Sequence, residues 1–191
     1  LDASNASCFD IKNACNSFIT ALEVADLYII SGKAETVLVV SGEVMSRYIR
    51  RKYESKEEVN STNATLGFGD AGAAFILQAA EVEDEDTYKG CQSRLASYGQ
   101  YWNEGVIWGG GTRHMAEEDK FYMKNIDPIM VQESSARAVF YFHDCMKETG
   151  VRIEDTQYFV TSQMSKFAIL KVADALKIPH EKVTTQVVET G

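Results

Sequence analysis

Long apolar stretches, paired cysteines and positive charge are scarce in this sequence. Val37–Val40 is a continuous apolar run, but a membrane-spanning helix needs roughly 18 such residues. The 28 acidic side chains outnumber the 19 basic ones, which gives a formal net charge of −9, the wrong sign for neutralising nucleic-acid phosphates. We therefore expect a soluble protein that has neither a membrane nor a nucleic acid as its partner.

The four cysteines, Cys8, Cys15, Cys91 and Cys145, stand singly, and the sequence contains no Cys-x-x-Cys pair. A chain of 191 residues can bury a core without disulfide bonds, so unpaired cysteines are typical of a reducing compartment. We expect a cytoplasmic protein without a metal ion or a resident cofactor.

The composition is that of a folded α/β protein, with 45% hydrophobic and 25% charged residues. The hydrophobic pattern predicts helices over 15–29, 136–149 and 167–176, and strands over 7–11, 36–40, 71–78, 88–98, 158–161 and 183–188. The apolar residues on both faces of 36–40 are typical of a parallel strand covered by helices on each side. Segment 47–63 is polar and predicts a surface excursion.

An acidic run at 81–86 separates two apolar parts of the chain and is expected to be a solvated connector. It predicts two similar halves in a layered α/β architecture, with boundaries 1–80 and 81–191. The chain begins at Leu1 and stops after a strand-like run, so we expect an internal segment of a longer protein.

Cys15 is the first candidate for a chemical role because it stands where a predicted strand meets a predicted helix. The unpaired N–H groups and the positive dipole end of a helix attract an anion such as a thiolate. The alternative is a small buried side chain without chemistry, which is the common state of a lone cysteine. The neighbouring residues decide between these interpretations.

Several segments resemble the β-ketoacyl-acyl-carrier-protein synthase III family of thiolase-fold condensing enzymes. They are Asp10–Phe18 around Cys15, Ala21–Asp26, Ser31–Gly32, Val37–Val44, Phe68–Ala74 and the glycine-rich Trp108–Arg113. The resemblance implies a thiolase-like α/β/α/β/α fold of two similar halves, only partly covered by this chain. It also implies a homodimer active in fatty acid biosynthesis.

The resemblance further implies that Cys15 accepts an acyl group from acyl-coenzyme A. The acyl-enzyme would then be attacked by the carbanion formed when malonyl-carrier protein is decarboxylated, so acyl-coenzyme A and an acyl carrier protein are the expected partners. On the family pattern Gln163 matches the family glutamine and is a candidate substrate-binding residue, while Ser162 occupies the position of the family histidine. The family asparagine would follow Gly191. Serine cannot take up a proton near pH 7, so decarboxylative condensation is in doubt.

Basic residues of this acidic chain cluster in one segment, at Arg47, Arg50, Arg51, Lys52 and Lys56. They lie where the family contacts coenzyme A, so Arg47, Arg50 and Arg51 are candidate substrate-binding residues, with a solvated loop as the alternative. Phe68–Gly72 is expected to be structural, His143 to lie in the core, and His114 and His180 on the surface.

Three functions remain open: a condensing acyltransferase, a plain acyltransferase that needs no enolate stabilisation, and a non-catalytic partner subunit that keeps the fold. Cys15 in its family setting favours an enzyme, whereas Ser162 favours the third.

Overall fold

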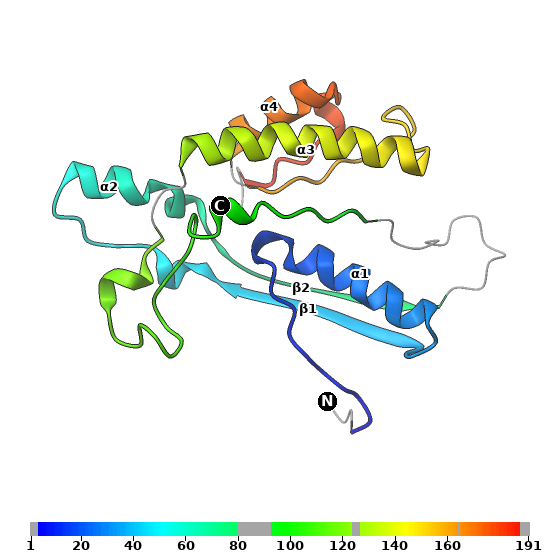
Figure 1. Ribbon diagram of the computed structural model, residues 1–191, viewed down its shortest axis with the longest axis horizontal. Coiled ribbons are helices and arrows are strands. Elements are labelled where there is room, and N and C mark those ends of the chain that lie inside the picture. Colours follow the sequence, from blue (N-terminus) through cyan, green and yellow to red (C-terminus); the bar gives the residue numbers. More distant parts are fainter. Residues whose placement is uncertain (1–3, 80–92, 124–126, 164, 188–191) are drawn as a thin grey trace. The chain divides into compact units, whose positions relative to one another are not determined.

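The computed structural model describes residues 4–79, 93–123, 127–163 and 165–187 (Figure 1). The helices and strands are α1 (Ser17–Ile30), β1 (Thr36–Val44), α2 (Lys56–Thr62), β2 (Asp70–Gln78), α3 (Pro128–Thr149) and α4 (Lys166–Leu176). Short 3-10 helices occur at Ala14–Asn16, Met45–Tyr48, Asn63–Gly67, Gly99–Tyr101, Glu118–Phe121 and His180–Lys182. The acidic run at 81–86 and Cys91 lie outside the described residues.

The chain divides into two units, one of Leu1–Gly42 with Gly72–Ser93 and the other of Glu43–Ala71 with Arg94–Gly191. The predicted boundary between two similar halves at residues 80 and 81 stays a prediction.

The first unit is built from α1 and the sheet β1–β2, and Figure 1 shows α1 running alongside the two strands. The Phe18 ring of α1 meets the Phe75 ring of β2 edge to face, with centroids 5.1 Å apart. Ala25 and Val39 are buried. As predicted, α1 stops at Ser31–Gly32, where Gly32 has φ +70° and its N–H donates to the Ile29 carbonyl.

The strand predicted at 36–40 is confirmed and extends to Val44, but its partner is antiparallel rather than parallel. The Ala79 N–H donates to the Glu35 carbonyl, and the Gln78 amide donates to the Thr36 hydroxyl, so the ends of β2 and β1 pair in opposite directions. Within the described residues only the Val39 face is covered, because Leu38 is 54% and Val40 65% exposed.

The core of the second unit forms around α4, where Ile169, Ala173, Leu176, Ile178 and Val183 are buried together. Val139 and Phe142 of α3 pack against them. Capping residues set the helix starts: Ser165 Oγ accepts from the Ala168 N–H, and Asp127 accepts from the Ile129 N–H just before Pro128. Both predicted helices are confirmed, and α3 begins earlier than predicted because Asp127–Pro128 starts it.

Four predicted strands, 7–11, 88–98, 158–161 and 183–188, are not formed as such within the described residues, which leave out 88–92 and 188. Residues 7–11 have no strand and are exposed up to Asp10. Ser93–Tyr98 is also not a strand, because side chains rather than a ladder hold it to α3: Arg94 pairs with Asp144 and Glu148. Segments 158–161 and 183–187 share one parallel bridge between Phe159 and Val183. A strand needs a backbone partner, which the first two segments lack within the described residues.

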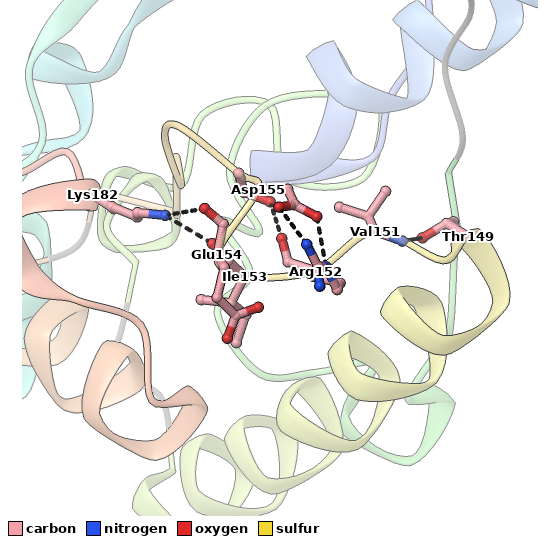
Figure 2. A network of polar contacts seen from close by, with 8 residues as sticks. Thr149, Val151, Arg152, Ile153, Glu154, Asp155 and Lys182 are labelled. Carbon is pink, nitrogen blue, oxygen red and sulfur yellow. Dashed lines mark hydrogen bonds and ion pairs between the residues drawn. The ribbon is translucent and has the colours of Figure 1, made fainter.

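The turn after α3 is fixed by the polar network in Figure 2. Arg152 and Asp155 form a bidentate pair with N–O distances of 2.7 and 2.8 Å. The Lys182 ammonium donates to the carbonyls of Ile153 and Glu154, at 2.9 Å each. This contact ties the turn to the segment that forms the bridge with Phe159, and so helps to position residues 158–163.

Candidate active site

Cys15 lies in the short 3-10 helix Ala14–Asn16, which leads into α1, and it is exposed. Of the predicted strand-to-helix junction only the helix is present, because residues 7–11 form no strand. Cys8 is exposed as well, so accessibility alone does not single out Cys15.

The residue before Cys15 distinguishes the two cysteines. Ala14 has φ +46°, a left-handed conformation that costs an L residue about 1–2 kcal/mol. Side chains of α1 hold this turn: Ser17 Oγ donates to the Ala14 carbonyl at 2.8 Å and accepts from the Asn13 N–H at 2.8 Å. Thr20 Oγ1 accepts from the Asn13 amide at 2.9 Å. Strain that the surroundings enforce is typical of functional sites.

The segment expected to carry the second catalytic position lies in the other unit. Ser162 is exposed, and no histidine occurs between His143 and His180. Gln163 is half-buried, and its amide hydrogen-bonds to backbone groups of Thr161, Thr184 and Val187. These contacts favour a structural task for Gln163 over direct substrate binding.

The basic excursion, residues 47–56, has an internal anchor at Arg50. Its guanidinium forms an ion pair with Glu58, donates to the Lys52 carbonyl at 3.1 Å and lies 5.3 Å from the centre of the Tyr122 ring. Arg47 and Arg51 are exposed and form no ion pair within the described residues. Two of the three predicted binding cations are therefore free to meet an anion, and the third organises the loop.

Helix α2 was not expected in this excursion, although the sequence carries a signal for it. Ser55 Oγ accepts from the Glu58 N–H at 3.1 Å, and Glu58 Oε2 accepts from the Glu54 N–H at 2.7 Å. A serine followed three residues later by a glutamate is the capping-box pattern that begins a helix. Glu58 thus serves both the helix start and the Arg50 anchor.

None of the three histidines lies in the segment that carries Ser162. The expectation that His143 lies in the core is wrong: His143 is exposed on α3, because the face buried against α4 includes Val139 and Phe142 instead. His114 contacts Glu117 and His180 contacts Asp174, at 2.6 and 2.7 Å.

The glycine-rich segment forms a tight turn. Gly110 and Gly111 have positive φ, and a side chain at Gly109 would approach the Phe121 ring and backbone to 2.8 Å. Among the residues that the structure describes, no cluster of His, Cys, Asp or Glu is arranged to hold a metal ion. No helix in the described ranges is both long and apolar enough to span a membrane.

Comparisons with known proteins show what this chain is similar to. The family model of 3-oxoacyl-[acyl-carrier-protein] synthase III matches residues 9–99, which include Cys15 and end before Ser162. The β-ketoacyl-[acyl-carrier-protein] synthase III of Brucella suis is 30% identical over 96% of this chain and 54% of its own length. That of Ehrlichia canis is 27% identical over 98% of this chain and 54% of its own length.

Solved structures have the same fold. 3-Oxoacyl-(acyl carrier protein) synthase III from Pseudomonas aeruginosa has a TM-score of 0.72 at 21% identity, covering 97% of this chain and 53% of that one. A variant of Xanthomonas campestris OleA, solved with bound lauric acid and lauroyl-CoA, has a TM-score of 0.75 at 24% identity, covering 96% and 53%. This chain therefore spans about half the length of the curated relatives it matches. The chain therefore has a thiolase-like fold and is related to the β-ketoacyl-[acyl-carrier-protein] synthase III enzymes over nearly all of its own length and about half of theirs.

Proposed function

We propose that this protein is an acyltransferase in which Cys15 takes an acyl group from an acyl-coenzyme A thioester. The observation that carries the proposal is the exposed Cys15 at the start of α1, directly after the strained Ala14 and inside the segment that matches the family model. An accessible thiol held by an enforced turn suits a nucleophile.

In the first step the Cys15 thiolate attacks the carbonyl carbon of the acyl thioester. The tetrahedral oxyanion collapses, the bond to the coenzyme A sulfur breaks, and coenzyme A leaves as a thiolate that takes up a proton. Backbone N–H groups at a helix start are suited to stabilise that oxyanion. The product is an acyl thioester on Cys15.

The second step depends on the acceptor. In condensation, malonyl-carrier protein loses carbon dioxide and the resulting carbanion attacks the acyl carbon, which releases the Cys15 thiolate. A hydroxyl at Ser162 donates one neutral hydrogen bond, whereas a histidine also takes up a proton near pH 7. We therefore expect weak condensation and retain transfer to an alcohol, amine or thiol, which needs no enolate, as the second reaction.

The basic excursion supplies the contact for the substrate's phosphates in this proposal. Arg47 and Arg51 are exposed and unpaired within the described residues, and the Arg50–Glu58 pair holds the loop that carries them. Phosphate is a good partner for guanidinium groups. The OleA structure with lauroyl-CoA makes a medium-chain acyl-coenzyme A a sensible first probe.

A non-catalytic partner subunit is the second candidate, favoured by the serine in place of the family histidine. Incubation with lauroyl-coenzyme A followed by peptide mass spectrometry separates the two candidates. The enzyme predicts an acyl group on Cys15, its loss in Cys15→Ser, and no change in Cys8→Ser, which removes the other exposed cysteine. Absence of acylation, or acylation of Cys8 instead, would contradict the proposed role of Cys15 and favour the non-catalytic subunit. The homodimer, the acyl carrier protein partner and the cytoplasmic location stay predictions.

A further inference from the structure

The side chain of Gln163 connects two segments that are distant in the sequence. Its Nε2 donates to the carbonyl oxygen of Thr161 at 3.0 Å and to that of Thr184 at 3.2 Å. Its Oε1 accepts from the Val187 N–H at 3.2 Å. The amide thus uses its donor group and its acceptor oxygen on backbone atoms of both segments.

These bonds begin where backbone pairing between the segments ends. The parallel bridge consists of the Phe159 N–H donating to the Lys182 carbonyl at 2.8 Å and the Thr184 N–H donating to the Phe159 carbonyl at 3.2 Å. Past this point, within the described part of the chain, no further backbone hydrogen bond joins them. A side chain therefore replaces the ladder and sets how far apart the two backbones lie.

The neighbouring hydroxyls do not share this task. The hydroxyl oxygens of Thr161 and Thr184 are buried and have no hydrogen-bond partner among the described residues. Ser162 is exposed between Thr161 and Gln163. The separation of the segments at this point consequently depends on the Gln163 amide.

We infer that Gln163 is a positioning residue, which fixes the location of Ser162 relative to residues 184–187. The inference rests on the proposed function for its catalytic meaning, since Ser162 is there the position at which the second step is altered. The flanking Thr161 carbonyl and the Gln163 side chain hold the Ser162 backbone on both sides. Ser162 is then presented in one place even though no strand ladder continues through it.

The test is Gln163→Glu, which keeps the size of the side chain and removes the two amide donors. At neutral pH a carboxylate faces the carbonyls of Thr161 and Thr184 and is repelled. The side chain then turns away from both segments, and its remaining oxygen no longer accepts from the Val187 N–H. Once protonated, the glutamic acid can again donate a hydrogen bond to one of these carbonyls. We expect the protection of the Val187 amide against hydrogen exchange to fall about tenfold at pH 7 and to recover at about pH 4, below the ordinary glutamate pKa of about 4.3.

Two further variants make the result specific. Gln163→Met has a similar volume and no polar atoms, so Val187 protection should be low at both pH values. Gln157→Glu adds the same charge at an exposed position of the same segment and should leave Val187 as in the wild type. Equal Val187 protection in the wild type, Gln163→Glu and Gln163→Met at both pH values would overturn the inference.

Acylation of Cys15 by lauroyl-coenzyme A is measured on the same preparations. The control Gln157→Glu should be acylated like the wild type, since Gln157 has no part in the proposed reaction. If Val187 responds as expected but Cys15 is not acylated in any variant, the positioning role stands and the proposed function fails. If Cys15 is acylated but Val187 does not respond, the proposed function stands and the positioning role of Gln163 fails.

Discussion

The turn at Cys15 and the segment at Ser162 are two candidate catalytic regions that the same family resemblance singles out, yet they differ in kind. At Cys15 the expected nucleophile is present, exposed, and preceded by a strained residue that α1 side chains hold in place. At Ser162 the expected histidine is absent, while the neighbouring Gln163 keeps an extended set of backbone contacts.

The two regions thus differ in whether they carry the expected reacting group or only the contacts that hold the backbone in place. In the proposed function the first region supplies the nucleophile Cys15, whereas the second has the backbone contacts of Gln163 but no histidine at Ser162. Acyl transfer to Cys15 needs only the first region, whereas decarboxylation needs a charged or acidic group in the second. The contrast therefore predicts a protein that begins the family reaction more readily than it completes it.

Restoring the family residue should give the largest effect. We expect Ser162→His to raise malonyl-thioester decarboxylation by about 10²–10⁴-fold, the usual contribution of a positioned general acid or base. The rate of carbon dioxide release measures it, and Ser162→Ala is the matched control that should stay near the wild-type rate. Rapid decarboxylation by the wild type would remove the contrast between the two regions, because another group would then supply the missing chemistry.

Removing a free cation from the basic excursion should have a smaller effect, confined to the first step. Arg51→Gln should raise the KM for acyl-coenzyme A about three- to tenfold, since a charge-assisted contact to phosphate is lost. The effect should shrink in high salt. Lys171→Gln, which removes an exposed charge from α4, should leave KM unchanged. An equal change in both variants would show that only net charge matters.

Relieving the strain before Cys15 should have opposite effects on stability and rate. Ala14→Gly removes the Cβ that disfavours φ +46°, and part of that gain is offset by the entropy of a more flexible unfolded chain. We expect a gain of about 0.5–1 kcal/mol in the free energy of unfolding by urea denaturation. Acylation of Cys15 should slow several-fold because the turn is less constrained.

A glycine in the interior of α1 provides the control. Ala21→Gly should lower the free energy of unfolding by about 1 kcal/mol, the usual cost of glycine in a helix. If Ala14→Gly destabilises the protein as much as Ala21→Gly, then Ala14 is not strained and one difference between Cys15 and Cys8 disappears.

The smallest effect concerns Asp70 at the start of β2, outside both regions. The Ser46 hydroxyl and N–H donate to its carboxylate at 2.6 and 2.8 Å and lower the pKa of Asp70. A lowered pKa contributes stability that is present above the ordinary value and is lost as pH falls through the folded pKa. Ser46→Ala should raise the pKa of Asp70 in an NMR titration and leave Cys15 acylation unchanged. An unmoved pKa would contradict the assigned cause.

Sequence patterns predicted the helices well because their signals are local. The spacing in α1 and α4 and the stop residues Ser31–Gly32 and Gly150 need no knowledge of distant partners. The capping box at Ser55–Glu58 and the Asp127–Pro128 start are equally local and could have been used.

Strands and the candidate site depend on contacts that the sequence does not reveal. Segment 158–161 is apolar enough for a strand, but its pairing with 183–187 stops after one bridge. The positive φ of Ala14 is held by a hydrogen bond from α1. The Gln163 side chain bonds to Thr184 and Val187, which lie 21 and 24 positions further along the chain. Hydrogen bonds between residues that are distant in the sequence leave no periodic pattern from which they could be predicted.

A chain that keeps the acylation step and has lost efficient decarboxylation should release coenzyme A without releasing carbon dioxide. Both products can be followed together after the protein is mixed with lauroyl-coenzyme A and a labelled malonyl thioester. We expect a burst of about one equivalent of coenzyme A per chain, as for a covalent intermediate, without matching carbon dioxide. Carbon dioxide released in step with coenzyme A, or no burst at all, would show that the two steps are not separated in this way.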